Sequence, residues 1–159
     1  MIGLQPGRPR PYLIALVMIV PVTVVAAVLL TIIPSGVLHD HTKNLVGSPS
    51  TASDYVAIVL LALAEEILFG GLTAGVFFRR VGVKKDNLLQ ALVFLAPHLL
   101  LHLVRVALWP LLSLQLIAGL VLGWLRQRSD SIGRCWLLHA ATNLGETELP
   151  DLARGDPAL

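Results

Sequence analysis

Long runs of uncharged, apolar residues limit what this chain can fold into. The first extends from Tyr12 to Ile33 without a charged side chain, and the second, from Tyr55 to Phe78, has only Glu65 and Glu66 as charged residues. A transmembrane helix needs about 20 such residues, and a soluble helix keeps a polar face that these runs lack. Charged residues make up only 14% of the 159 residues, against about 25% in soluble domains. The sequence therefore predicts an integral membrane protein.

Three shorter apolar segments follow, at residues 88–108, 111–125 and 132–144, and residues 34–54 form a polar stretch typical of an exposed loop. No period-2 alternation suggests membrane-spanning strands. We expect an all-α fold, a polytopic membrane helix bundle of about five membrane helices. The first segment is expected to be an uncleaved anchor, and the short fifth segment either to pack inside the bundle or not to cross the membrane fully. Residues 1–144 would form one membrane-embedded domain, with a motif-bearing core at 55–144, and residues 145–159 a polar tail.

Lys and Arg are distributed unevenly between the ends of these segments. With a cytoplasmic N-terminus, nine of the twelve fall on the cytoplasmic side, as the positive-inside rule requires. The nine are Arg8, Arg10, Arg79, Arg80, Lys84, Lys85, Arg126, Arg128 and Arg134. We expect this orientation in the cell (plasma) membrane. Because topology accounts for the basic residues, we expect no nucleic-acid partner.

Cysteine and glycine give weaker indications. Cys135 is the single cysteine, so the chain has no internal disulfide, and we expect a buried thiol at a helix start. Two Gly-x-x-x-Gly pairs, Gly71/Gly75 and Gly119/Gly123, allow helices to approach closely. Packing within the chain is the favoured interpretation, and self-association through these faces is the alternative.

Polar residues inside the apolar segments point to a functional site. An ionisable side chain at the bilayer centre costs about 2.5–3.5 kcal/mol. At about 1.5 Å per residue, Glu65, His98 and Asn143 each lie about 14–15 Å from an end of their own segments, and so at one depth. His139 is four residues before Asn143 and shares its helix face. Glu65 and Glu66 are about 100° apart around a helix, so we expect them to have different roles.

These residue types suit peptide hydrolysis. A carboxylate with an imidazole can activate water, and a second imidazole with an amide can donate to a developing oxyanion. Together they are the minimum for amide hydrolysis. Glu65, His98 and His139 are also possible ligands of a divalent metal such as zinc, although the H-E-x-x-H pattern is absent. No other cofactor is indicated.

Three motifs between Tyr55 and Leu144 resemble the CAAX protease and bacteriocin-processing family of intramembrane proteases (CPBP, or Abi). The family patterns are E-E-x-x-x-R, F-x-x-x-H and H-x-x-x-N/D, in this order on successive membrane helices. The matching residues here are Glu65-Glu66, Phe94 with His98, and His139 with Asn143. The resemblance implies an all-helical fold with the active-site cavity within the membrane. It also implies that Glu65 is the general base acting with His98 on water, that His139 and Asn143 form the oxyanion site, and that Glu66 supports them.

The chain departs from the first motif, because Gly70 stands where the family has arginine. We therefore expect Glu66 to be protonated or paired elsewhere, with Arg105 as a candidate partner. The main hypothesis is an endopeptidase that cuts a peptide or membrane-protein substrate near or within the lipid bilayer. One alternative is a non-catalytic membrane scaffold or immunity protein. Another is a proton or ion pathway built on the glutamates and histidines.

Overall fold

The computed structural model describes residues 10–33, 49, 51–73, 83–104, 106–129 and 131–152. Every regular element in these residues is helical, which confirms the all-α prediction. The elements in order are α1 (Arg10–Ile32), α3 (Ala52–Glu65), the π-helix η1 (Glu66–Thr73), α5 (Val83–Val104), the 3₁₀ turn η2 (Val106–Leu108), α6 (Trp109–Ser129) and α7 (Ile132–Leu152).

Three helical stretches are long and apolar enough to cross a membrane: Tyr12–Ile32, Ala52–Leu72 and Trp109–Arg128. Large apolar side chains project outward from them, with Val17 on α1 70% exposed and Leu61 on α3 59% exposed. Apolar surface of this extent is unfavourable in water and suits contact with lipid tails. The helices α5 and α7 have 22 and 21 residues. At about 1.5 Å per residue, both are also long enough to match a hydrocarbon core of about 30 Å.

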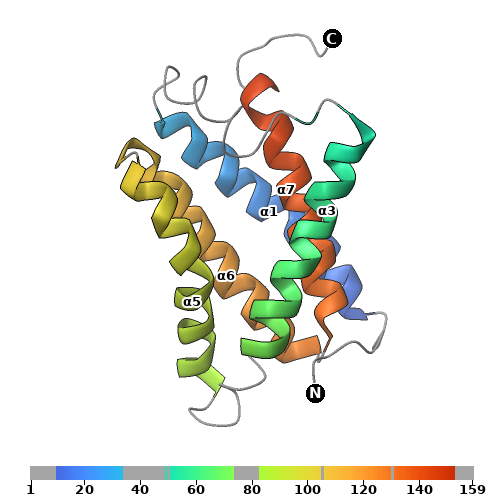
Figure 1. Ribbon diagram of the computed structural model, residues 1–159. Coiled ribbons are helices and arrows are strands. Elements are labelled where there is room, and N and C mark those ends of the chain that lie inside the picture. Colours follow the sequence, from blue (N-terminus) through green and yellow to red (C-terminus); the bar gives the residue numbers. More distant parts are fainter. Residues whose placement is uncertain are drawn as a thin grey trace.

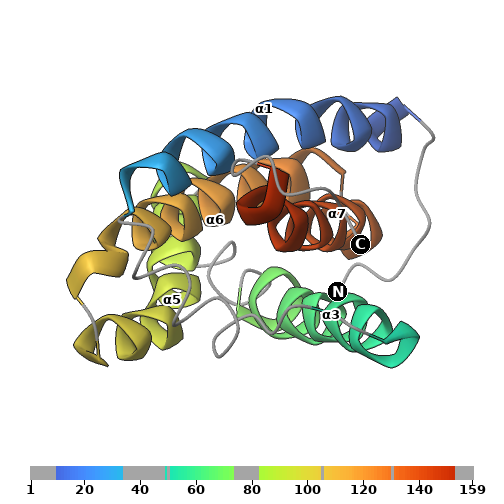
Figure 2. The same cartoon turned by 90° about the horizontal axis from the view of Figure 1, so that it is seen from above.

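The helix α7 is the central element of the bundle. It packs against α1, α3 and α6, while α5 packs mainly on α6. Seen from above, α1 runs along one side of α6 and α7, and α3 lies on the opposite side of α7 (Figure 2). The core between α1, α6 and α7 is formed by Ala15, Leu122, Leu125, Cys135 and Leu138. This core fixes one face of α7 and leaves another face toward α3 and η1 (Figure 1).

The Gly119/Gly123 pair on α6 faces α5. A Cβ atom at Gly119 would lie 3.2 Å from the Cα atom of Ala91, and one at Gly123 would contact the side-chain oxygens of Asn87 and Gln90. The interpretation of this pair as packing within the chain is therefore confirmed. In the other pair Gly71 is buried, and Gly75 lies outside the described residues.

Several helix boundaries differ from the predictions. The helix α3 begins at Ala52, inside the stretch predicted as a loop, and the Thr51 amide donates to Asp54 Oδ2 at 2.9 Å to cap it. The helix α6 begins at Trp109, before the predicted start at residue 111, because Pro110 stands in its first turn, where proline is tolerated. The helix α7 continues to Leu152, beyond residue 144. Its contact with α1 persists at Gly145, and tertiary packing of this kind outweighs weak helix propensity.

Cys135 lies in the first turn of α7 and is completely buried. Its thiol donates to the carbonyl oxygen of Leu122 on α6, with the sulfur 3.4 Å from that oxygen. The prediction of a buried thiol at a helix start is confirmed.

Candidate active site

The two adjacent glutamates lie at a change of helix type. The helix α3 ends at Glu65, and η1 begins at Glu66. A π-helix has a wider turn than an α-helix and occurs frequently at functional sites. Gly70 and Gly71, which are weak formers of ordinary helix, lie in the middle of η1. The glutamates thus stand where the backbone changes from α-helical to π-helical geometry.

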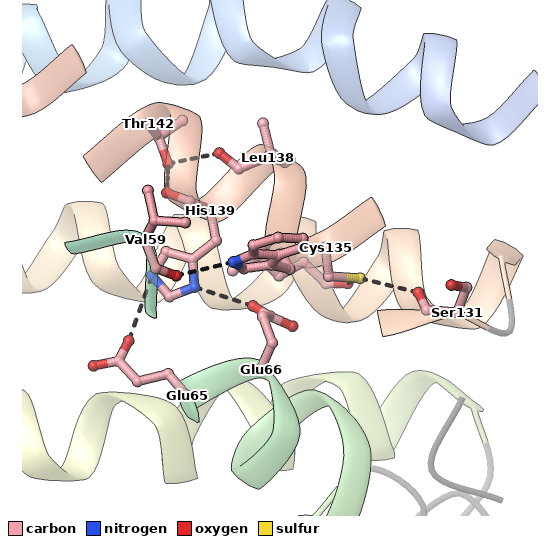
Figure 3. A network of polar contacts seen from close by, with 10 residues as sticks. Val59, Glu65, Glu66, Ser131, Cys135, Leu138, His139 and Thr142 are labelled. Atoms are coloured by element: carbon pink, nitrogen blue, oxygen red, sulfur yellow. Dashed lines mark hydrogen bonds and ion pairs between the residues drawn. The ribbon is translucent and has the colours of Figure 1, made fainter. Parts of the chain in front are cut away.

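Both carboxylates reach the same imidazole, that of His139 on α7 (Figure 3). His139 Nε2 lies 3.4 Å from Glu65 Oε2, and His139 Nδ1 lies 3.1 Å from Glu66 Oε1. The two ring nitrogens point in different directions, so neighbouring glutamates with different orientations can each contact one of them. The side chains of Glu66 and His139 are only 4% and 6% exposed, whereas that of Glu65 is 24% exposed. Glu65 is therefore the carboxylate that water or a substrate can reach.

His98 contacts its own helix. Its Nδ1 lies 2.9 Å from the carbonyl oxygen of Phe94, one turn earlier on α5. A carbonyl oxygen only accepts, so this bond requires the proton on Nδ1, and Nε2 is then free to accept a proton. The Phe94 ring contacts both histidines, with its centroid 5.1 Å from the ring centroid of His98 and 5.7 Å from that of His139. Phe94 thus contributes two groups to the site: its backbone carbonyl accepts from His98, and its ring contacts both histidines.

The rest of the third motif follows on α7. Asn143 stands one turn after His139 and is half-buried. The hydroxyl of Thr142 shares its proton between the carbonyl oxygens of Leu138 and His139, at 3.0 and 2.9 Å. The indole nitrogen of Trp136 donates to the carbonyl oxygen of Val59 at 3.0 Å, which joins α7 to α3 close to the glutamates. These bonds fix the part of α7 that carries His139.

The contacts differ from the expected pairing in one respect. From the sequence, Glu65 and His98 are expected to act on one water molecule, whereas the direct contact of Glu65 in the described part of the chain is with His139. Glu66 has a partner elsewhere, as expected, and that partner is His139. Arg105, the candidate considered from the sequence, lies outside the described residues.

Arg126 is a residue of this region that the sequence did not single out. It lies near the end of α6 and is only 6% exposed. Its Nε donates to the carbonyl oxygen of Gly70 in η1 at 3.0 Å. In the sequence it stands beside Arg128 at the end of an apolar segment, where arginine ordinarily marks the membrane boundary. Only the packing of α6 against η1 reveals its contact.

The possible metal ligands do not come together as a set. Among the residues that the structure describes, no three His, Cys, Asp or Glu side chains lie close enough to hold one ion. Glu65 and His139 meet, but His98 is bonded to its own helix. Metal dependence stays a prediction.

Comparison with known families identifies the chain. A family model described as type II CAAX prenyl endopeptidase Rce1-like matches residues 47–145, more than half of the sequence. The chain belongs to this family. The matched region contains all three motifs and every residue of the Glu65–His139–Glu66 contact. Membership in this family of membrane proteases agrees with the three helical stretches able to cross a membrane, and the chain is an integral membrane protein. No curated protein and no solved structure matches it.

Proposed function

We propose that this protein is an intramembrane endopeptidase that hydrolyses a peptide bond near or within the membrane, with water as the nucleophile. The observation that supports this most strongly is the contact of His139 with both glutamates in a chain of a protease family. A buried carboxylate and imidazole, with a second carboxylate beside them, would be costly as a purely structural device, since replacing buried ion pairs by apolar residues is often neutral or stabilising.

Glu65 is the general base in this proposal. As the more exposed carboxylate, it takes a proton from a water molecule while the water oxygen bonds to the carbonyl carbon of the scissile peptide. The unprotonated Nε2 of His98 accepts the other hydrogen of that water and orients it. Glu65 then returns its proton to the peptide nitrogen, the carbon–nitrogen bond breaks, and a carboxyl group and an amine are released.

Glu66 orients His139 in the same proposal. In this proposal His139 is the doubly protonated imidazolium: Glu66 accepts from Nδ1 and fixes the orientation of the ring, and the proton on Nε2 faces Glu65 and the reacting carbonyl. His139 Nε2 and the Asn143 amide donate to the oxyanion that forms in the tetrahedral intermediate. Removing a donor of this kind costs about 10²–10³-fold in rate.

The family description suggests the first substrate class to test, a protein with a prenylated C-terminal CAAX sequence. A lipid-modified peptide would lie in the bilayer and approach the site from the membrane. A cytoplasmic N-terminus in the plasma membrane, as the positive-inside rule predicts, belongs to the same proposal. The non-catalytic scaffold is not favoured, because the chain belongs to a protease family and Glu65, Glu66 and His139 of the proposed chemistry are in contact.

The test is product analysis with the purified full chain in liposomes. A farnesylated CAAX peptide and its unprenylated counterpart are incubated with the wild type and with Glu65→Gln, and the released peptides are identified by mass spectrometry. We expect the wild type to release the C-terminal residues and Glu65→Gln to be at least about 10²-fold slower. Equal cleavage by Glu65→Gln would show that the base is another residue. If the wild type cleaves no peptide while Glu65→Gln complements a null strain, the function is non-catalytic.

A further inference from the structure

A buried arginine contacts the backbone next to the site without belonging to any of the three motifs. Arg126 comes from α6, 56 residues along the chain from Gly70, and its Nε donates to the Gly70 carbonyl oxygen. Burying a guanidinium is costly unless polar groups compensate for the lost water. Among the described residues, no carboxylate lies within ion-pair distance of Arg126. A buried cation that is directed onto a backbone carbonyl therefore needs an explanation.

Gly70 connects this arginine to Glu66. A Cβ atom at Gly70 would lie 2.6 Å from Glu66 Oε2, so this oxygen occupies the space that a side chain at position 70 would need. The other oxygen of the same carboxylate, Oε1, faces His139 Nδ1. The position of the Gly70 backbone therefore sets the space in which the Glu66 carboxylate lies, and through Glu66 it sets the orientation of His139.

The π-helical backbone at Gly70 needs support from outside its own helix. Glycine has no side chain to hold it in place, and it loses more conformational freedom on folding than any other residue. The bond from Arg126 ties this turn to α6, which is itself packed against α5, α1 and α7. It also brings a positive charge to the segment around Gly70, the position at which the first motif of the resembling family has an arginine.

We propose that Arg126 is a positioning residue for the proposed reaction: from α6 it fixes the π-helical turn at Gly70 and thereby holds Glu66 against His139. Arginine at position 70 and the carboxylate of Glu66 would compete for one space, and the arginine from α6 avoids this competition. This role rests on the proposed function, because it acts through Glu66 and His139 on the reacting groups.

Arg128 offers a matched control. It lies two residues further along α6, is exposed, and has its guanidinium 4.7 Å from the centroid of the Trp124 ring. Arg126→Gln and Arg128→Gln remove the same charge from the same helix end. For Arg126→Gln we expect kcat to fall about 10- to 100-fold, as for residues that orient a catalytic group, with KM changed little. Arg126→Lys, which keeps a charge and a donor, should lose less, and Arg128→Gln should match the wild type.

The single cysteine provides a readout that does not depend on cleavage. Cys135 is completely buried, and its thiol donates a hydrogen bond to the carbonyl oxygen of Leu122, one turn before Arg126 on α6. Loosening of the contact between α6 and η1 should increase the rate at which a maleimide labels this thiol in Arg126→Gln, but not in Arg128→Gln. If the wild type cleaves and Arg126→Gln has the kcat of Arg128→Gln, the positioning role is wrong while the proposed function stands. If the wild type cleaves nothing, the proposed function fails. Independently of cleavage, equal labelling rates of Cys135 in Arg126→Gln and Arg128→Gln would overturn the positioning role of Arg126.

Discussion

His139 Nδ1 lies 3.1 Å from Glu66 Oε1, and both side chains are almost completely buried. This contact joins the first and third motifs across α3, η1 and α7. It also gives Glu66 a partner in a chain that has glycine at position 70, where the resembling family has arginine. The buried carboxylate, for which the sequence offers Arg105 as a candidate partner, is in this structure the group that contacts the imidazole of His139.

Replacing Glu66 by glutamine should impair catalysis more than folding. The amide keeps the size of the side chain but removes the charge that favours a proton on His139 Nδ1. We expect kcat to fall about 10- to 100-fold with KM nearly unchanged. Kinetics on a fluorogenic peptide, together with the melting temperature in detergent, would measure both effects. A variant with normal kcat would mean that Glu66 does not orient the ring.

Two glycine substitutions should separate activity from stability. In Gly70→Ala the new methyl group displaces Glu66 Oε2, so kcat should fall about tenfold or more, with stability changed by no more than about 1 kcal/mol. In Gly119→Ala the methyl group meets Ala91 and Phe94 at 3.2–3.3 Å. This crowding should destabilise the α5–α6 contact by about 1–3 kcal/mol. Thermal unfolding and peptide cleavage measured on both variants would show the two patterns, and the reverse pattern would contradict the packing described.

Replacing the aromatic ring of Phe94 by an aliphatic side chain should lower both stability and kcat. Its ring contacts both His98 and His139, and Phe69 in η1 packs edge-on against it with centroids 5.4 Å apart. Phe94→Leu keeps the backbone carbonyl that accepts from His98 but loses the ring contacts, each worth about 0.5–1.5 kcal/mol. We expect lower stability and at least about tenfold lower kcat. Phe69→Leu is the matched control, because it removes a ring that contacts Phe94 but neither histidine, and equal kcat losses in the two variants would argue against the role of Phe94.

Asp86 should make stability depend on pH. It lies in the first turn of α5, ahead of the apolar segment that begins at residue 88, and neither of its carboxylate oxygens has a hydrogen-bond partner among the described residues. Burial raises the pKa of Asp86 from 3.8 to about 6. The folded state then binds the proton more tightly than the unfolded state, so stability is greatest below about pH 4 and declines as pH rises through about 6.

Asp86→Asn stays neutral at every pH. We expect this variant to be more stable than the wild type at pH 7.5 by about 1–3 kcal/mol and to lose the decline between about pH 4 and 6. Melting temperatures of both proteins across this range would measure the difference. Parallel curves for the two proteins would show that Asp86 stays charged in the folded state.

The sequence was sufficient for the helical class, and it singled out Glu65, Glu66 and His139, whose side chains meet in the structure. Long apolar runs predict helices directly, and the prediction that Glu65, His98 and Asn143 lie near one another rests on their equal depth in the membrane. The depth of a residue in the membrane does not determine the direction of its side chain around the helix axis. Depth alone therefore could not show that His139 contacts both Glu65 and Glu66. The π-helical turn at Glu66 and the reach of Arg126 to Gly70 depend on tertiary packing, which leaves no periodic signal in the sequence. For the same reason the end of α7 was placed too early.

The most direct test of the account is a double-mutant cycle between Glu66 and His139, measured as kcat for peptide cleavage. If Glu66 acts through His139, Glu66→Gln alone should lower kcat about 10- to 100-fold relative to the wild type. In a His139→Gln background the same substitution should lower kcat almost no further, as expected for residues that act as one unit. Fully additive losses in the double variant would contradict the account, because they would mean that the two side chains contribute to cleavage independently.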